Sequence, residues 1–355
     1  MTQNLPTVTP ADLGLPTATP LPKRRDWRIG MVGFGGIARH AHAPAYTQAG
    51  WKIAAVADPD PRAREAAQRD FAVPTAYEDY HDLIADPSVE VVDLLTQPTL
   101  RLPVVEAAAA AGKPIVTEKP IAETLAEAEA MVEAAQRGAI PFAVHQNYRW
   151  MPANFLAHHI VQAGLIGRPF FSSITIYGSQ DVALADHPFY STCNAFLTVQ
   201  WDTHMQDLLR FWTGRDPKRI SANKARMHGQ KFRDDMLLSV LVDYGDCLTG
   251  HILHHELTRS ALQGCACRID GDQGTIEFDF WHDALTIDSA VTGGGPRQLD
   301  ISQCRFLSSF AGSMGDLLIA VEEGREPQVS GRRNIATLRA VLNEERSASQ
   351  NGQWV

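Results

Sequence analysis

The stretch that decides the fold reads Arg28-Ile29-Gly30-Met31-Val32-Gly33-Phe34-Gly35-Gly36-Ile37-Ala38, an apolar run that breaks into glycines. Gly33, Gly35 and Ala38 occupy the small-residue positions of a G-x-G-x-x-A turn. Such a turn lets a backbone approach a pyrophosphate and lets a helix pack closely on a strand. Residues 36–49 are predicted to form that helix, with its N-terminal N–H groups facing the phosphate. The stretch therefore predicts a dinucleotide-binding strand, turn and helix.

A second predicted strand, residues 52–58, ends in Asp58. This acid lies about 20 residues beyond the glycine turn, where a carboxylate can bind the ribose hydroxyls of adenosine. A carboxylate at that place repels a 2′-phosphate, so we expect NAD as the cofactor in preference to NADP. Arg62 and Arg64 are the nearby cations that could admit NADP.

Composition excludes several classes of protein. The chain has 355 residues, 45% of them hydrophobic and 21% charged, with a net charge of −9. This balance is typical of a globular protein and argues against binding to nucleic acid or to an anionic membrane. The five cysteines are odd in number and scattered, which predicts free thiols in a reducing compartment, so we expect a cytoplasmic location.

Two domains follow from the pattern of strands and helices. Up to residue 144 apolar strands alternate with helices, one of which starts at a Thr124/Glu127 capping box, and this predicts a doubly wound parallel sheet. From residue 168 alternating strands flank turns at 244–247 and 271–274, which predicts antiparallel hairpins, with helices near 154–164, 200–213 and 306–324. The predicted fold class is an α/β Rossmann-type domain followed by an α+β domain with a large, mainly antiparallel open sheet.

The predicted domain bounds are as follows. Residues 1–26, rich in proline and threonine, form a disordered or extended arm. Residues 27–146 form the dinucleotide-binding domain, and residues 147–355 form the domain for substrate binding and oligomerisation, whose C-terminal helix could pack back on the first domain. One face of an open sheet needs a partner, so we expect a homodimer or homotetramer formed through that sheet.

The tripeptide Glu118-Lys119-Pro120 follows the predicted strand 114–116, at the carboxyl edge where doubly wound folds bind ligands. A lysine ammonium there can bind and polarise a substrate hydroxyl during hydride transfer. The alternative is a surface lysine paired with Glu118.

A second polar group lies on the predicted helix 200–213. Gln200 and Asp207 are four and three residues from His204, so both can lie on its face of the helix, and Asp207 could orient the imidazole. Asp202 projects about 200° away unless the helix starts after it. The histidines at 251, 254 and 255 are interpreted as polar positions of a strand, and we predict no metal site.

Together these motifs resemble the glucose–fructose oxidoreductase and inositol dehydrogenase family, called Gfo/Idh/MocA. The resemblance runs from about residue 28 to the end, through the glycine turn, Asp58, the Glu118-Lys119-Pro120 tripeptide, the segment 147–152 and Asp202-Thr203-His204. The chain departs from the family pattern at Gln97, an insertion, and at Gln200, where many members carry an acid; Asp202 could supply that carboxylate.

The resemblance implies NAD(P)-dependent oxidation of a sugar or polyol, with Lys119 and His204 as the catalytic pair and Asp207 in support. The favoured substrate is an aldose, pentose or hexose, oxidised to a lactone; a cyclitol oxidised to a ketone is the second choice. The alternatives are a non-catalytic regulator that binds NAD and sugar, or a glycosidase or sugar oxidoreductase that retains its NAD. The implied cofactor contacts are Gly33, Gly35, Gly36, Ile37, Asp58, Thr96, Pro98, Glu118, Lys119 and Asn147, and the implied substrate contacts are Arg149, Gln200 and Asp202.

Overall fold

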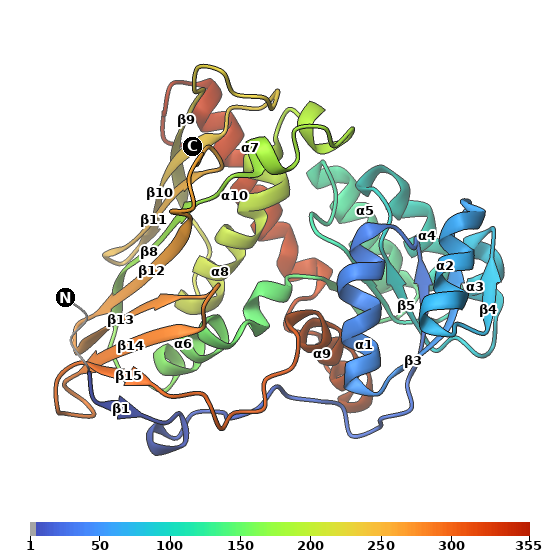
Figure 1. Cartoon of the computed structure of the whole chain (residues 1–355), viewed down its shortest axis with the longest axis horizontal. Coiled ribbons are helices and arrows are strands. Elements are labelled where there is room, and N and C mark those ends of the chain that lie inside the picture. Colours follow the sequence, from blue (N-terminus) through green and yellow to red (C-terminus); the bar gives the residue numbers. More distant parts are fainter. Residues whose placement is uncertain (1–4) are drawn as a thin grey trace. The chain divides into compact units, whose positions relative to one another are not determined.

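The computed structural model describes residues 5–355, which form two compact units (Figure 1). The parallel-sheet unit comprises residues 19–150 and 307–338, and the open-sheet unit comprises residues 5–18, 151–306 and 339–355. The expected second domain, 147–355, is therefore interrupted. Residues 307–338 belong to the parallel-sheet unit because the apolar helix α9, Ser309–Glu323, packs against α1 and β6 of that unit.

Six strands form the parallel sheet, in the order β4-β3-β2-β5-β6-β7, and each neighbouring pair is parallel. This is the strand order of a dinucleotide-binding fold, so the predicted fold class is confirmed for this unit. The strands are β2 Arg28–Val32, β3 Lys52–Ala57, β4 Thr75–Tyr77, β5 Val91–Leu94, β6 Ile115–Thr117 and β7 Phe142–Val144.

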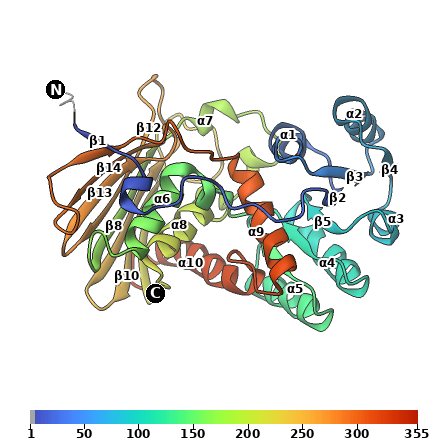
Figure 2. The same ribbon diagram turned by 90° about the horizontal axis from the view of Figure 1, so that it is seen from below.

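Helices cover both faces of this sheet, with α1 and α2 along one side and α3, α4 and α5 along the other (Figure 2). The predicted capping box is confirmed, since Thr124 and Glu127 exchange both hydrogen bonds at the start of α5. The bounds are α1 Ala43–Ala49, α2 Pro61–Phe71, α3 Tyr80–Ala85, α4 Arg101–Ala110 and α5 Leu125–Arg137, with short 3₁₀ turns η3 Pro98–Leu100 and η4 Asn147–Trp150.

The helix after the glycine turn differs from its prediction. Residues 36–49 were expected to be α-helical, but η2, Ala38–His42, is π-helical and α1 begins only at Ala43. A π-turn holds one more residue than an α-turn and so changes the direction of the side chains it carries. Here it accompanies the burial of His42, whose ring bonds to Asp93 and Glu118 in the interior.

Nine strands form the open sheet, in the order β1-β15-β14-β13-β12-β8-β11-β10-β9. The β8–β11 and β1–β15 pairs are parallel and the other pairs are antiparallel, so the prediction of a mainly antiparallel sheet is confirmed. Both predicted hairpins form, at 244–247 and 271–274. The strands are β1 Thr7–Val8, β8 Pro169–Tyr177, β9 Arg219–Ala225, β10 Leu237–Gly245, β11 Leu248–His255, β12 Gly264–Gly271, β13 Gly274–Asp279, β14 Ala284–Ser289 and β15 Arg297–Leu299.

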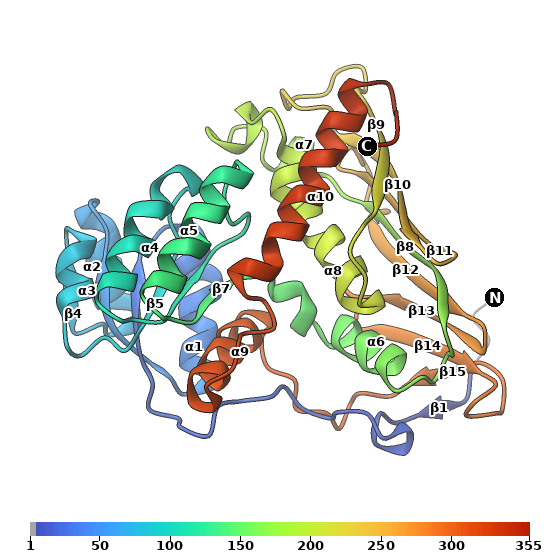
Figure 3. The same ribbon diagram turned by 180° about the vertical axis from the view of Figure 1, so that it is seen from behind.

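Helices α6 and α8 lie on one face of the open sheet, together with the part of α10 that belongs to this unit (Figure 3). The predicted helix 200–213 is in fact two elements, because η6, Phe196–Asp202, is π-helical and α8 starts at Thr203. The bounds are α6 Pro152–Gln162, α7 Gln180–Ala183, α8 Thr203–Thr213 and α10 Gly331–Ser349, with 3₁₀ turns η1 Ala11–Leu13 and η5 Tyr190–Thr192.

The N-terminal arm, from residue 5 on, lies extended along its own chain. Thr7 and Val8 form the edge strand β1 beside β15, and Ala18 makes a bridge to Arg305. An edge position suits a proline-rich segment, because few of its backbone N–H groups are needed for pairing. In the part of the chain that the structure describes, no helix is both long and apolar enough to cross a membrane.

Candidate functional site

A cavity of about 820 Å³ opens at the carboxyl edge of the parallel sheet. Its walls come from the ends of β2, β3 and β5 and from the start of α4, and they include four of the predicted cofactor residues. Ligands of doubly wound sheets bind at this edge. The four predicted cofactor residues in the cavity wall are Gly33, Gly35, Asp58 and Thr96.

The glycine turn fits a pyrophosphate. Gly33 has φ +89°, and a Cβ added to it would lie 3.2 Å from the carbonyl carbon of Leu95. A side chain at Gly33 would therefore be strained and would meet the neighbouring backbone. Gly35 and Gly36 face open space, so no side chain obstructs the approach of a ligand to their backbone. Ile37, the next residue, is exposed.

Asp58 closes the cavity at the end of β3. Its Oδ2 accepts the N–H of Phe34, at 2.7 Å, and its Oδ1 accepts the N–H of Asp60, at 2.9 Å. The Arg64 guanidinium donates to the carbonyls of Asp58 and Pro59, so it is held on the backbone by two hydrogen bonds. The carboxylate next to the glycine turn is the feature expected for a cofactor with a free 2′-hydroxyl.

The loop that carries Lys119 follows β6 at the same edge of the sheet. The buried Arg101 guanidinium donates to the carbonyls of Glu118 and Pro120 and, at 2.8 and 3.0 Å, to that of Thr96. One side chain thus fixes both the Lys119 loop and the loop after β5. Burial lowers the pKa of Lys119, and Arg101 lowers it further, while the neighbouring Glu118 carboxylate raises it.

Glu118 was expected to bind the cofactor, and its carboxylate makes two contacts within the parallel-sheet unit. Oε1 faces His42 Nε2, at 2.9 Å, and Oε2 accepts the backbone N–H of Lys119, also at 2.9 Å. Both oxygens are occupied and the side chain is buried. Glu118 therefore supports the Lys119 loop from inside the unit.

His42 lies at the centre of a buried group that we call the His42 cluster: Tyr46, Asp93, Glu118 and His145 surround it. Its Nδ1 is 3.1 Å from Asp93 Oδ2, which also accepts the Tyr46 hydroxyl at 2.8 Å. Burial lowers the pKa of His42, but the two carboxylates outweigh it and raise the pKa to about 9. The pKa of Glu118 falls to about 2, because the bonds to His42 outweigh the effect of burial.

His42, Asp93 and His145 are also the one group within residues 5–355 whose ligand atoms lie close enough to hold a metal ion. However, both ring nitrogens of His42 already face carboxylates, and His145 bridges Asp93 and Ser313 at 3.0 Å each. Hydrogen bonds thus account for these nitrogens without an ion. The absence of a metal stays a prediction.

In the open-sheet unit, η6 and the first turns of α8 bring Gln200, Asp202, His204 and Asp207 into one buried region. Asp207 lies 3.9 Å from the Arg210 guanidinium, one turn along the helix. The Trp201 ring stands edge-on to His204, with centroids 6.5 Å apart. Because Gln200 lies in a π-turn, the four-residue spacing to His204 no longer places the two on one α-helical face.

The carboxylate of Asp202, which we expected to contact substrate, has a partner within the open-sheet unit. It is fully buried, with its Oδ1 against His254 Nδ1, and His254 Nε2 lies 2.9 Å from Glu256 Oε1. We call these three residues the His254 cluster. Asp202 is committed to that cluster because α8 begins after it, which turns its carboxylate toward β11.

The remaining expected site residues, Asn147, Arg149 and Pro98, lie within the parallel-sheet unit. Asn147 donates to Ser309 Oγ, at 3.0 Å, and the buried Arg149 donates to the carbonyl of Gln328, at 3.3 Å. Pro98 is buried at the start of η3, beside the cavity-lining Gln97.

Sequence reasoning missed the two histidine clusters. One signal was available for the first: Asp93 stands inside the apolar run 91–95, predicted as a fully buried strand, and a buried carboxylate requires a partner. For the second cluster, the sequence analysis interpreted His254 as a polar position of a strand and did not identify the carboxylates that bond to it.

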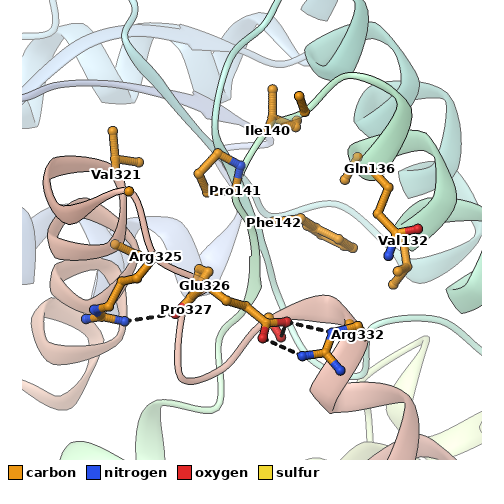
Figure 4. A pocket seen from close by; sticks show the side chains of 15 residues that line it. Val132, Gln136, Ile140, Pro141, Phe142, Val321, Arg325, Glu326, Pro327 and Arg332 are labelled. Atoms are coloured by element: carbon orange, nitrogen blue, oxygen red, sulfur yellow. Dashed lines mark hydrogen bonds and ion pairs between the residues drawn. The ribbon is translucent and has the colours of Figure 1, made fainter.

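A second cavity, of about 500 Å³, lies between α5, the residues before β7 and the end of α9 (Figure 4). Val132, Ile140 and Phe142 line it, and Glu326 pairs with Arg332 at its rim. It lies at the amino end of β7, whereas doubly wound sheets bind their ligands at the carboxyl ends. We therefore assign the dinucleotide to the first cavity.

Fold and cavity together define a dinucleotide-binding protein, and comparison with known proteins agrees. Residues 27–145 match the family described as "Oxidoreductase family, NAD-binding Rossmann fold", and residues 156–277 match the "GFO/IDH/MocA C-terminal domain". The chain belongs to the Gfo/Idh/MocA family of oxidoreductases, and NAD is its cofactor.

Named relatives match the chain over different lengths. It is 28% identical to a D-apiose dehydrogenase of Paraburkholderia graminis over 321 residues, which are 88% of this chain and 84% of the relative. A levoglucosan dehydrogenase of Pseudarthrobacter phenanthrenivorans is 38% identical over 151 residues, covering 39% of this chain and 38% of the relative. An oxidoreductase of Agrobacterium radiobacter, solved with NAD+, L-tartaric acid and magnesium, superposes with a TM-score of 0.84 at 25% identity, covering 93% of this chain and 98% of the other.

Proposed function

We propose that this oxidoreductase removes hydride from a hydroxyl-bearing carbon of a small sugar or polyol. The observation that carries the proposal is the Lys119 loop, which follows β6 at the edge of the sheet where the cavity for the dinucleotide opens. The relatives support the substrate class, because they are named as dehydrogenases of D-apiose, levoglucosan and inositol.

Each proposed role follows from the chemistry of the side chain. Bound NAD supplies the hydride acceptor. The Lys119 ammonium donates a hydrogen bond to the reacting oxygen, and the His204 imidazole takes the hydroxyl proton, since an ordinary imidazole pKa lies near neutral pH. Asp207 orients His204, while Arg149 and Gln200 hydrogen-bond other hydroxyls of the substrate.

We favour an aldose, pentose or hexose, which would leave as a lactone; a cyclitol, which would leave as a ketone, is the second choice. Preference for NAD over NADP rests on Asp58, whose carboxylate would repel a 2′-phosphate.

We also propose that the protein forms a homodimer or homotetramer through the outer face of the open sheet, where Tyr177 and Leu241 are exposed. We further propose that it is located in the cytoplasm.

The proposal is tested by incubating the purified protein and NAD with D-glucose, D-xylose, D-apiose, levoglucosan and myo-inositol, and measuring NADH. We expect steady NADH formation with at least one of them and a higher kcat/KM with NAD than with NADP. NAD binding without turnover of any of the five would favour the non-catalytic regulator. Product without accumulated NADH would favour a glycosidase or sugar oxidoreductase that retains its NAD.

A further inference from the structure

The backbone of Lys119 is held by the side chain that precedes it. Glu118 Oε2 accepts the N–H of Lys119, at 2.9 Å, and Oε1 bonds to His42, at 2.9 Å. The position of the Glu118–Lys119 peptide therefore depends on where His42 holds the carboxylate. Arg101 fixes the same peptide from another direction, through the carbonyl of Glu118.

The His42 ring is itself fixed at both nitrogens. A neutral imidazole can donate through only one nitrogen, yet each nitrogen of His42 faces a carboxylate, Asp93 at 3.1 Å and Glu118 at 2.9 Å. Two donated bonds therefore require the imidazolium. Tyr46 and His145 occupy the other lone pairs of Asp93, at 2.8 and 3.0 Å, so Asp93 cannot turn away without losing them.

The cluster suits positioning and does not suit proton transport to solvent. His42, Tyr46, Asp93 and His145 are fully buried, and the far end of the hydrogen-bonded series is the equally buried Ser313. The π-turn that carries His42 begins at Ala38, the last small residue of the glycine turn. One short segment thus contributes both to the dinucleotide site and to the support of the Lys119 loop.

We propose that His42 is a positioning residue for the reaction, which acts through Glu118 to fix the Lys119 ammonium where the substrate hydroxyl binds. The inference rests on the proposed role of Lys119. It connects the glycine turn, through His42, Glu118 and Lys119, to the reacting oxygen of the substrate.

The test uses His42→Gln, which keeps a polar side chain of similar size but cannot carry the charge. Ser313→Ala is the matched control, because it alters the same buried series at the end remote from Glu118. With the best substrate of the five-compound panel, we expect kcat of His42→Gln to fall by about 10- to 100-fold. The dissociation constant for NAD should change less than about threefold, and Ser313→Ala should keep at least about half of wild-type kcat.

Two further readouts separate positioning from mere instability. If His42 acts through Glu118, the His42→Gln/Glu118→Gln double variant is no slower than the slower single variant, since removing one link makes the other irrelevant. In NMR spectra of histidine-labelled protein without substrate, the His42 ring should stay protonated up to about pH 9 and lose its proton at lower pH in Glu118→Gln.

Several results would overturn the inference: wild-type kcat in His42→Gln, equal losses in His42→Gln and Ser313→Ala, or multiplied losses in the double variant. Lys119→Ala, measured alongside, tells the two proposals apart. If Lys119→Ala keeps full activity, the proposed function of Lys119 fails. If Lys119→Ala is inactive while His42→Gln is fully active, only the role of His42 fails.

Discussion

Each unit of this protein buries one histidine between two carboxylates, and the two arrangements differ in one respect. In the parallel-sheet unit His42 bonds to Asp93 and Glu118, and in the open-sheet unit His254 bonds to Asp202 and Glu256. Burial lowers the pKa of each imidazole, but the carboxylates outweigh it and raise both values to about 9. Each cluster also lies next to a proposed catalytic residue, since Glu118 precedes Lys119 and Asp202 lies two residues before His204.

The difference lies in the remaining oxygens. In the His42 cluster, both oxygens of Asp93 are hydrogen-bonded. In the His254 cluster, Asp202 Oδ2 has no hydrogen-bond partner among the described residues, and neither has Oε2 of the nearby buried Glu344. Burial raises the pKa of both carboxyls. The Asp202 carboxylate raises the pKa of Glu344 further, whereas His254 lowers the pKa of Asp202 without outweighing the effect of burial. The fully hydrogen-bonded carboxylates of the His42 cluster thus have lowered pKa values, whereas the incompletely hydrogen-bonded Asp202 and Glu344 have raised ones.

The largest expected effect concerns the residues that the two clusters adjoin. Lys119→Ala and His204→Ala should each lower kcat by about 100- to 10,000-fold, because each removes a group that acts on the reacting hydroxyl. The dissociation constant for NAD, measured by fluorescence, should stay near the wild-type value. Lys119→Arg should not restore kcat, since a planar guanidinium cannot replace a compact ammonium. If kcat of Lys119→Ala stayed near the wild-type value, the proposed catalytic role of Lys119 would be wrong.

The next effect is on stability. His254→Gln leaves the Asp202 and Glu256 carboxylates buried without their cation, so urea denaturation should show a loss of about 3 kcal/mol in the free energy of unfolding. The folded pKa of His254 is raised, so this stabilisation is full below about pH 6.5 and is lost as the pH rises through about 9. His251→Gln is the matched control, because His251 lies on the same strand but is partly exposed, and it should cost less than about 0.5 kcal/mol. Equal losses in the two variants would contradict an ion-paired His254.

The smallest effect concerns Glu344, the buried carboxyl whose pKa the nearby Asp202 raises. Since burial raises the folded pKa of Glu344, the wild-type protein should lose stability as the pH rises above about 4.5, where the unfolded chain releases this proton. Glu344→Gln has no proton to release, so its free energy of unfolding at pH 8 should exceed that of wild type by about 1 kcal/mol. The exposed Glu123→Gln serves as the control and should leave the pH dependence unchanged. If Glu344→Gln were less stable than wild type at every pH, ionisation of Glu344 would not be what destabilises the wild-type protein at high pH.

Much of the fold could be predicted because its signals are local. The glycine turn, the capping box at Thr124 and the hairpin turn at 244–247 each depend on residues a few positions apart, and each forms as expected. Asp58 was placed beside the turn by a spacing that the parallel sheet imposes, and its carboxylate accepts the N–H of Phe34.

The two histidine clusters could not be predicted in the same way. His42 lies 51 residues from Asp93 and 76 from Glu118, so only the folded sheet brings these groups together. The π-turns at Ala38–His42 and Phe196–Asp202 were missed because an apolar pattern does not tell an α-turn from a π-turn over so few residues. Asp202 was placed among the substrate contacts by the family resemblance alone, and its bond to His254, 52 positions along the chain, forms only in the folded sheet.

The central claim is that this chain transfers hydride from a sugar or polyol to NAD and releases both products. The most direct measurement uses the best substrate of the panel, labelled with deuterium at the carbon that is oxidised, and follows the label by mass spectrometry. The account predicts deuterated NADH in a one-to-one ratio with the oxidised sugar; in Lys119→Ala the amounts of both products formed in a given time should fall together, at an unchanged ratio. Label that returns to a sugar product while NADH stays bound, or no transfer of label from any of the five compounds despite NAD binding, would contradict it.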